Sequence, residues 1–318
     1  MSSGVTDARS ALHDATVEQL RAHPKELPAV WLYDERGAQL YERIMQLPEY
    51  YLPRREAEVL RSHAPEIATR TKARTLVELG AGSASNTRYL LDALERARTL
   101  ERFVPFDASP EMLELGARAV AAAYPRVSVD AVVGDFEHDL DKLPRRGPRL
   151  VTFLGSTIGN LHADERVKLL GALAAILEKD DALVIGVDLV KDVVRLEAAY
   201  NDASGVTEAF VRNALAHVNR ELDATFDQRR FAYEARWDPA NEWMDMGLRA
   251  REAHSVQLQR PPIELTFAAG EWLRVEISTK FRRAGIEQDA AGAGLALESW
   301  WTDAAGDFGV ALLSGKET

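Results

Sequence analysis

The sequence predicts an α/β protein in which a parallel sheet carries the ligand site and a second, α+β part is joined to it. Three observations favour this fold class. Apolar runs of strand length alternate with helical patterns between residues 75 and 190, and a glycine turn follows the first run. The pattern changes at Val190, where two helical segments and then short alternating strands follow. Alternation of strand and helix is typical of βαβ units, and therefore of parallel strands.

The glycine turn lies in residues 75–87, which read Thr-Leu-Val-Glu-Leu-Gly-Ala-Gly-Ser-Ala-Ser-Asn-Thr. Its first residues are mostly apolar, as in a buried parallel strand. Gly80 and Gly82 follow, and they allow the backbone to approach a nucleotide-like ligand closely. A dinucleotide fingerprint would have glycine or alanine at position 85, where this chain has Ser85. The pattern that stands here is acid-x-Gly-x-Gly with Glu78 as the acid, and an ordinary glycine turn is the alternative.

Polar side chains follow the expected parallel strands at the points where these strands end. In open α/β sheets the ligand binds at this edge, and an acid one crossover after the glycine turn suits ribose hydroxyls. A solvated loop or a helix cap is the alternative for each residue taken singly. The strands are expected at 76–79, 103–107, 127–133, 149–154 and 182–187, and the polar residues are Asp107, Asp135, Asn160 and Asp188.

The remaining segments alternate between helical and strand-like patterns. The segment 48–53 has a proline at each end, which predicts an extended or turning conformation. Apolar spacing predicts helices at 38–47, 54–64, 163–179, 192–200 and 207–222, after a tail that runs into a helix over 1–25. Strand patterns cover 230–237, 243–250, 254–258 and 267–280, followed by a closing pair at 295–302 and 308–313.

Composition excludes several classes of function. The 318 residues contain no cysteine, which rules out disulfides and cysteine-based zinc sites, and the seven histidines lack the spacing of metal ligands. A net charge of −11 without a basic stripe argues against nucleic acid. Residues 1–20 do not resemble a signal peptide, and no apolar run approaches the ~20 residues of a membrane span. We therefore expect a cytoplasmic monomer with no metal, no nucleic-acid partner and no membrane contact.

Several stretches together resemble a known family. The acid-x-Gly-x-Gly pattern and the closing strand pair are similar to class I S-adenosylmethionine-dependent methyltransferases. Motifs outside the glycine turn are more specific, and over nearly its whole length the chain resembles the L-histidine Nα-methyltransferases of ergothioneine biosynthesis. These motifs are Tyr33-Asp-x-x-Gly37, Leu47-Pro-Glu-Tyr-Tyr51, 153–161, 188–192, 199–202, 267–271, Glu276-Ile-Ser278 and Trp300-Trp-Thr-Asp303.

The resemblance implies an activity and a set of site residues. Enzymes of this family transfer three methyl groups in turn from S-adenosylmethionine to the α-amine of histidine, and the product is hercynine. At position 86 the family usually has lysine, so a charged contact from Asn86 to the cofactor's carboxylate is in doubt, although a neutral hydrogen bond is possible. The implied cofactor residues are Gly80, Asn86, Asp107 at the ribose, Asp135 and Phe136 at the adenine, and Gly155. The implied substrate residues are Tyr50, Asn160 and Tyr200 at the amino and carboxylate groups and Glu276 and Ser278 at the imidazole, with Tyr33 as the catalytic candidate near the amine.

The resemblance also implies two domains. Residues 55–190 and 281–318 would form the methyltransferase core, and residues 1–54 and 191–280 the histidine-binding domain. In a strand, Glu276 and Ser278 point to one face and could read both nitrogens of an imidazole, whereas the alternative for Glu276 is a surface pair with Lys280 or Arg274. The alternative for Tyr33 is packing on Trp31.

Three other functions remain open from the sequence. A methyltransferase could act on another amino acid, such as tryptophan or tyrosine, although a buried Glu276 disfavours an apolar ring. A non-catalytic nucleotide-binding protein is the second alternative. A nicotinamide dehydrogenase is the third, and the serine at position 85 argues against it.

Overall fold

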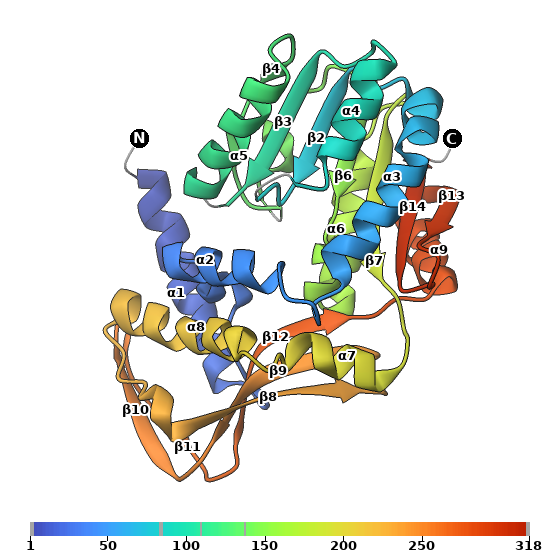
Figure 1. The fold of residues 1–318 in the computed structure, drawn as a ribbon. Coiled ribbons are helices and arrows are strands. Elements are labelled where there is room, and N and C mark those ends of the chain that lie inside the picture. The colour runs from blue at the N-terminus through green and yellow to red at the C-terminus, as the bar shows by residue number, and fades with distance from the viewer. Residues whose placement is uncertain (1–2, 83–84, 109, 137, 316–318) are drawn as a thin grey trace. The chain divides into compact units, whose positions relative to one another are not determined.

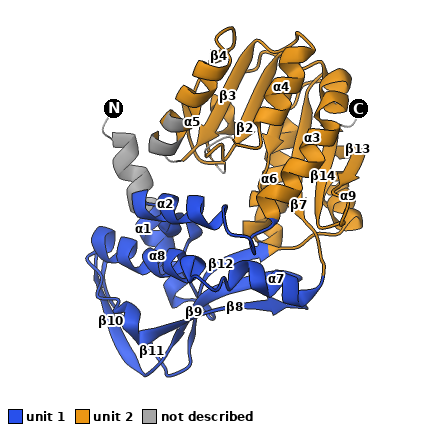
Figure 2. Cartoon of the chain, viewed as in Figure 1, with its two compact units in different colours: residues 1–51, 192–278 blue, residues 52–191, 279–318 orange. Residues whose placement is uncertain are grey.

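The chain folds into the helices and strands drawn in Figure 1, a computed structural model that describes residues 3–82, 85–108, 110–136 and 138–315. They form two compact units (Figure 2). Unit 1 contains residues 1–51 and 192–278, and unit 2 contains residues 52–191 and 279–318. The chain passes between the units within one to three residues of the points expected from the sequence, 54/55, 190/191 and 280/281. Which ligand each unit binds stays a prediction at this stage.

Unit 2 is built on a sheet with strand order β13-β14-β7-β6-β2-β3-β4, and β5 also pairs with β3. All pairings among β7, β6, β2, β3, β4 and β5 are parallel, whereas β14 is antiparallel to both of its neighbours. The predicted fold class, a parallel sheet closed by antiparallel C-terminal strands, is confirmed. The strands are β2 (Thr75–Leu79), β3 (Arg102–Asp107), β4 (Ser128–Val129), β5 (Val132–Val133), β6 (Arg149–Phe153), β7 (Ala182–Asp188), β13 (Leu295–Thr302) and β14 (Phe308–Gly315).

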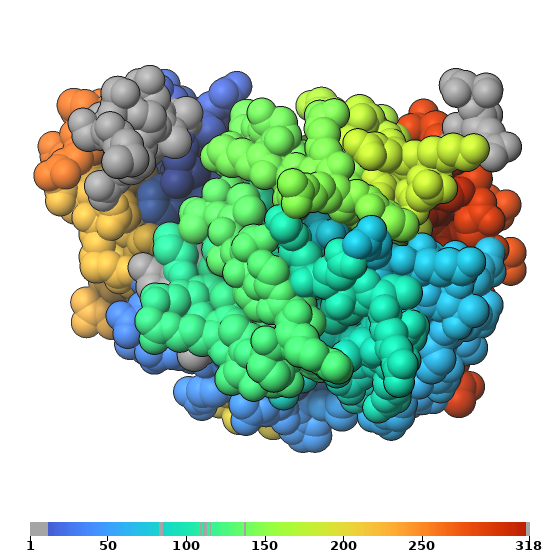
Figure 3. Space-filling view, turned by 90° about the horizontal axis from the view of Figure 1, so that it is seen from above, coloured from blue at the N-terminus to red at the C-terminus, as the bar shows by residue number. Residues whose placement is uncertain are grey.

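Helices cover both faces of this sheet. Alternate strand residues such as Val77, Val151 and Ile185 pack in one core with α6 (Ala163–Ile176) and α9 (Arg283–Gly292). The residues between them face the opposite side, where α3 (Leu52–Thr71) and α4 (Arg88–Arg96) lie. Helix α5 (Pro110–Ala123) packs against β3. Figure 3 looks onto unit 2 from the side of the strands' amino-terminal ends, where chain segments in cyan and green fill the surface.

The strand expected at 127–133 is divided into β4 and β5. The carbonyl oxygens of Phe103 and Asp107 accept hydrogen bonds from the amides of Asp130 and Gly134 (2.9 and 3.0 Å). Pro105 lies between these two positions of β3, so the N–H that it lacks would have pointed to the same neighbour. The missing donor accounts for the interruption of the ladder.

Other differences concern element ends and elements that the sequence did not predict. Helix α3 begins at Leu52, inside the segment expected to be extended, because a proline at the second position of a helix requires no N–H donor. The strand expected at 267–280 is β12 (Trp272–Thr279), and the sequence reading missed β11 (Pro262–Phe267) and α9. A strand that begins with proline and a helix with three alanines and two glycines both give weak periodic signals.

Unit 1 contains a four-stranded sheet in the order β1-β12-β9-β8 and a hairpin of β10 and β11. Helices α7 and α8 pack on the sheet, and α2 and η1 pack on α8. The elements are α1 (Ser3–Arg21), β1 (Lys25–Glu26), η1 (Ala29–Leu32), α2 (Glu35–Ile44), α7 (Val193–Tyr200), α8 (Val206–Leu222), η4 (Gln228–Arg230), β8 (Phe231–Asp238), β9 (Trp243–Ala250) and β10 (His254–Gln259).

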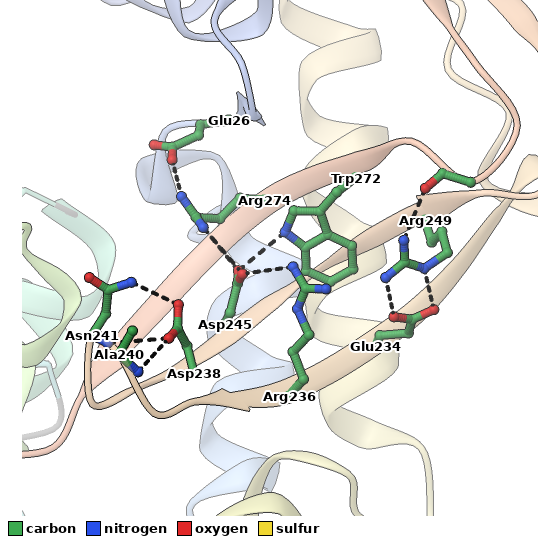
Figure 4. A network of polar contacts seen from close by, with 11 residues as sticks. Glu26, Glu234, Arg236, Asp238, Ala240, Asn241, Asp245, Arg249, Trp272 and Arg274 are labelled. Atoms are coloured by element: carbon green, nitrogen blue, oxygen red, sulfur yellow. Dashed lines mark hydrogen bonds and ion pairs between the residues drawn. The ribbon is translucent and has the colours of Figure 1, made fainter.

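A polar network joins three strands of this sheet (Figure 4). The buried carboxylate of Asp245 on β9 accepts from Nε of Arg274 (2.9 Å), Nη2 of Arg236 (3.2 Å) and Nε1 of Trp272 (3.3 Å). The guanidinium of Arg236 also lies 4.5 Å from the ring centre of Trp272. Arg274 reaches Glu26 on β1 as well. Asp245 therefore links β8, β9 and β12, and β12 also carries two of the substrate candidates considered below, Glu276 and Ser278.

Within the described residues, no helix is both long and apolar enough to cross a membrane.

A buried ion pair ties the entry of β6 to the start of β7. The side chain of Arg149 is fully buried, and Nε and Nη2 donate to Oδ2 of Asp181 at 2.8 and 2.5 Å. The other oxygen of Asp181 accepts from the backbone N–H of Arg149 at 2.6 Å. Every charge-bearing atom of the carboxylate thus has a partner, which is the condition for a buried pair to be tolerated.

We expect Asp181→Ala to lower the free energy of unfolding by about 3–5 kcal/mol, because it leaves the buried Arg149 guanidinium without its counter-ion. Urea unfolding followed by circular dichroism measures this change. Asp164→Ala, which removes the exposed i,i+4 pair with Lys168, is the matched control and should leave the urea midpoint unchanged. Equal midpoints for both variants would show that Asp181 contributes no more than a surface carboxylate.

Candidate active site

The glycine turn of unit 2 adopts backbone angles that only glycine accepts without strain. Gly80 has φ of 69° and Gly82 has φ of 44°, both in the left-handed region. The N–H of Gly80 donates to the carbonyl oxygen of Phe106 (2.8 Å), and the N–H of Gly82 donates to Oδ2 of Asp107 (3.1 Å). The turn after β2 and the end of β3 are thereby held together.

The residues expected at the ribose and adenine lie on neighbouring strand ends. The main chain of Asp107 accepts from Gly134, just after β5, at 3.0 Å. Phe136 packs against Phe106 and Phe153, with ring centres 6.0 and 5.3 Å apart, and a Cβ on Gly80 would lie 3.5 Å from its ring. The carboxylate of Asp135 is more than half exposed and lies 3.3 Å from Nδ1 of His138. An aromatic face and two carboxylates therefore surround the glycine turn.

The end of β6 brings two further predicted residues to this edge. Gly155 follows the strand with φ of 70°, and Asn160 ends the 3₁₀ turn η3 (Thr157–Asn160) and is half-buried. Both belong to unit 2. Asp188 at the end of β7 is fully buried and is paired with Lys191 and with Nζ of Lys280 at 3.0 Å. Its carboxylate therefore forms ion pairs with two lysines of unit 2.

The side-chain amide of Asn86 is bonded within unit 2. Its Nδ2 donates to the carbonyl oxygen of Pro53 (3.1 Å) and to Oε2 of Glu56 (2.7 Å). These two bonds use both hydrogens of the amide. The contact of Asn86 with the cofactor's carboxylate stays a prediction, and through the amide N–H groups it would require one of these bonds to break.

Two carboxyl groups of this region are buried without a cation. Burial raises the pKa of Glu56 to about 7, opposed by its bonds to Asn86 and Gly155. Burial also raises the pKa of Glu78 to about 8, and the hydroxyl of Thr87, which donates to Oε1, opposes that change. Oε2 of Glu78 has no hydrogen-bond partner within the described part of the chain.

Glu56 was missed by the sequence reading, although the sequence carried a signal for it. Leu52, Glu56, Val59 and Leu60 are all buried on one face of α3. A carboxylate at an apolar position of an amphipathic helix is costly unless it is bonded, so it marks a position worth attention.

Unit 1 contains the residues expected at the substrate with the exception of Asn160. The rings of Tyr50 and Tyr200 meet edge to face at 5.9 Å, and both side chains are buried. The hydroxyls of Tyr200 and Ser278 are 2.9 Å apart. Glu276 lies on the same strand as Ser278 and is also buried, with 9% of its surface exposed. The structure thus brings Tyr50, Tyr200 and Ser278 into contact.

The alternative reading of Glu276 as a surface residue does not fit its burial. Arg274 is bound to Asp245 and Glu26, and Lys280 is bound to Asp188. Glu276 is instead among the groups whose charge raises the pKa of Tyr50 well above its ordinary value, after the main cause, burial. Tyr50 is therefore a neutral hydroxyl throughout the physiological pH range.

Tyr33 follows η1 and is the most exposed of the substrate candidates, with 40% of its surface accessible. Its ring contacts Tyr41 (6.0 Å) and Phe210 (5.6 Å), and Trp31 packs on His13 and His217. Packing on Trp31, the alternative for Tyr33, stays untested by these contacts. A tyrosine that the sequence reading missed, Tyr233 of β8, donates to the carbonyl oxygen of Tyr200 at 2.6 Å.

The sheet order, the glycine turn and the acids at the strand ends define a class I S-adenosylmethionine-dependent methyltransferase. The model of the histidine-specific, S-adenosylmethionine-dependent methyltransferases matches residues 12–315. The chain belongs to this family.

Similar proteins cover the chain from end to end. It is 48% identical to the histidine N-alpha-methyltransferase of Mycolicibacterium smegmatis over 96% of this chain and 95% of that protein. It is 47% identical to the protein of the same name from Mycobacterium tuberculosis, over 95% and 94% of the two chains. Ergothioneine biosynthesis protein 1 of Neurospora crassa is 29% identical over 92% of this chain, which spans 33% of that protein.

Unit 2 fits the cofactor that the family uses. The left-handed glycines open the backbone at the carboxyl edge of the sheet, and Asp107, Asp135 and Phe136 supply the acceptors and the aromatic face that a nucleoside requires. Among the described residues no group of three or more histidine, aspartate or glutamate side chains could hold a metal ion.

We expect Asp107→Ala to weaken binding of S-adenosylmethionine by about 1.5–3 kcal/mol, the range for a hydrogen bond to a charged group. Isothermal titration measures the affinity. Asp130→Ala changes an acid that directly follows β4 and pairs with Arg102 at 2.9 Å; it is the control and should bind like wild type. Unchanged affinity in the Asp107 variant would remove this carboxylate from the site.

Proposed function

We propose that this chain methylates the α-amino group of L-histidine three times with S-adenosylmethionine, giving hercynine for ergothioneine biosynthesis. The observation that carries the proposal is a pair of buried polar residues on β12 in unit 1, Glu276 and Ser278, of which Ser278 contacts the hydroxyl of Tyr200. The names of the mycobacterial relatives support the same substrate. In this proposal unit 1 is the histidine-binding domain and unit 2 the cofactor-binding domain.

The pair on β12 suits an imidazole. A neutral imidazole has one N–H donor and one bare acceptor nitrogen. Glu276 accepts from the donor, and Ser278 donates to the acceptor when its own oxygen accepts from the Tyr200 hydroxyl 2.9 Å away. The hydrogen bond from Tyr233 to the Tyr200 carbonyl (2.6 Å) fixes the end of α7 that carries this tyrosine. In the proposal, Asn160 of unit 2 and Tyr50 hold the carboxylate and amino groups.

The amine must lose a proton before each transfer, because an ammonium has no lone pair. The free α-amine of histidine has a pKa of about 9, above the peptide value of about 8, so roughly one per cent is deprotonated near neutrality. A strong base is therefore not required. Tyr50 orients the amine as a neutral hydroxyl, since its pKa is raised by burial. Tyr33, partly open to water, relays the proton.

The sulfonium of S-adenosylmethionine supplies the methyl group and the reactivity, and the protein supplies position. The faces of Tyr33, Tyr50 and Tyr200 favour the cationic methylammonium that accumulates through the three steps. This preference explains why aromatic residues surround the amine.

The alternatives predict other binding patterns. A methyltransferase for tryptophan would leave Glu276 without a matching donor arrangement and Ser278 without an acceptor. A non-catalytic nucleotide-binding protein would bind the cofactor and not histidine. We further propose a cytoplasmic monomer that has no nucleic-acid partner, in keeping with the net charge of −11.

Mass spectrometry of histidine incubated with the protein and S-adenosylmethionine tests the function directly. We expect products heavier than histidine by one, two and three methyl groups, with the trimethylated product accumulating. Tryptophan and tyrosine are the comparison substrates. Methylation of either in preference to histidine, or no methylated product at all, would contradict the proposal.

We expect Glu276→Ala to lower kcat/KM for histidine by roughly 30- to 1000-fold, or about 2–4 kcal/mol, because the imidazole N–H loses a charged acceptor. The kcat at saturating histidine should fall less, because the ring is remote from the reacting nitrogen. Steady-state kinetics with histidine and tryptophan measure both effects, and discrimination between the two should shrink.

Glu264→Ala on the exposed side of β11 is the matched control for this change and should keep wild-type kinetics. Wild-type affinity and selectivity in the Glu276 variant would place this carboxylate outside the histidine pocket and reopen the question of the substrate.

A further inference from the structure

The carboxylate of Glu56 connects three parts of unit 2 that are distant in sequence. Oε1 accepts from the backbone N–H of Gly155, just after β6, at 2.7 Å. Oε2 accepts from Nδ2 of Asn86, in the turn that leads into α4, at 2.7 Å. The side chain belongs to α3 and is 2% exposed. The buried carboxylate of Glu56 is thus hydrogen-bonded to both the loop after β2 and the loop after β6, which contain predicted cofactor residues.

The sheet leaves room for this carboxylate at one position of β7. A Cβ built on Gly186 would lie 2.3 Å from Oε1 of Glu56, closer than real contacts allow. Thr152 on β6 and Glu78 on β2 occupy the same face of the sheet, since they alternate with the residues packed on α6 and α9. The carboxylate of Glu56 therefore receives two hydrogen bonds and occupies space that is open only because residue 186 of β7 is glycine.

A purely structural carboxylate in this position would be expected to have a cation. The buried aspartates at the two ends of β7 do: Asp181 pairs with Arg149, and Asp188 pairs with Lys191 and Lys280. Glu78, like Glu56, accepts from a neutral donor, the hydroxyl of Thr87. Glu56 instead has an amide and a backbone N–H. Arg55, the preceding residue of α3, pairs instead with other acids: its Nε lies 3.6 Å from Oδ2 of Asp303 and 3.2 Å from Oδ2 of Asp307.

We propose that Glu56 is a positioning residue of the cofactor site, which as an anion holds the loops after β2 and β6 through Asn86 and Gly155. The proposal rests on the cofactor contacts given under the proposed function. Protonation places a hydrogen on one of two oxygens that both accept, so one of the two bonds is lost. Cofactor binding and ionisation of Glu56 are then coupled.

The groups around Glu56 set the pH range of this coupling. Burial raises the pKa of Glu56 to about 7. Asn86, Gly155 and Gly186 carry no charge, and Glu78 is a second buried carboxyl, whose pKa burial raises to about 8. Because the folded pKa of Glu56 lies above the unfolded value, folding favours the protonated form. Its contribution to stability is complete below pH 4 and is lost as the pH rises through 7.

Glu56→Gln separates positioning from simple structural support. Gln keeps the shape and cannot ionise, so relative to wild type its urea midpoint should rise between pH 5 and pH 8. Its affinity for S-adenosylhomocysteine, measured by isothermal titration, should be at least tenfold weaker at pH 8. The loss should be smaller at pH 6, where wild-type Glu56 is largely protonated too. A residue with only a structural role would lose binding and stability together.

A second variant, Asn86→Lys, tests the coupling between cofactor affinity and pH even if Glu56→Gln does not fold. Asn86→Lys places an ammonium beside the carboxylate and should move the pH range in which affinity declines to lower pH. Glu66→Gln, an exposed acid two to three turns further along α3, is the control and should match wild type throughout.

The results divide cleanly. If the wild-type protein binds S-adenosylhomocysteine and methylates histidine, the proposed function is supported. If it does neither, the proposed function is wrong. If wild type is active and Glu56→Gln binds within twofold of it at pH 8, or its relative urea midpoint does not rise with pH, this inference alone is wrong. An unshifted pH range in Asn86→Lys overturns it as well.

Discussion

The organisation of unit 2 depends on how buried carboxylates at its sheet are neutralised. Asp181 and Asp188 each meet a buried cation, and they fix the start and the end of β7. Glu56 and Glu78 meet only neutral donors. Removing an ion from water costs several kcal/mol unless it is paired. The two acids without cations are therefore the strained ones, and both lie beside the glycine turn.

Strain of this kind is expected at functional sites rather than in supporting structure. A carboxyl group with a pKa near 7 can exist in either form at working pH, so its bonds to neighbouring loops respond to ligand and proton alike. In unit 1, by contrast, burial keeps two ionisable tyrosines in a single, neutral form. Burial raises the pKa of Tyr50 and Tyr233 and keeps both neutral, which suits residues that orient a substrate by hydrogen bonds.

The proposed division of cofactor and substrate binding between the units agrees with their architecture. Parallel strands collect their carboxyl ends at one edge, where backbone donors and loops can meet a nucleoside. The sheet of unit 1 presents side chains from a strand instead, and a strand offers two polar groups on one face at fixed spacing. A small substrate with two ring nitrogens matches that spacing. Asp245 and its arginines stabilise this sheet without entering the candidate site.

The sequence by itself determined the parallel sheet, the glycine turn, Asp107 at the end of β3 and the change of pattern after Val190, because local periodicity and turn chemistry encode them. It also specified the Glu276-Ile-Ser278 spacing, which depends only on strand geometry. It did not reveal the break opposite Pro105, the engagement of Asn86 with Glu56, or the contact of Tyr200 with Ser278. Each of these depends on residues separated by some 25 to 80 positions, and only tertiary packing brings such residues within hydrogen-bonding distance and decides which of them lose contact with water.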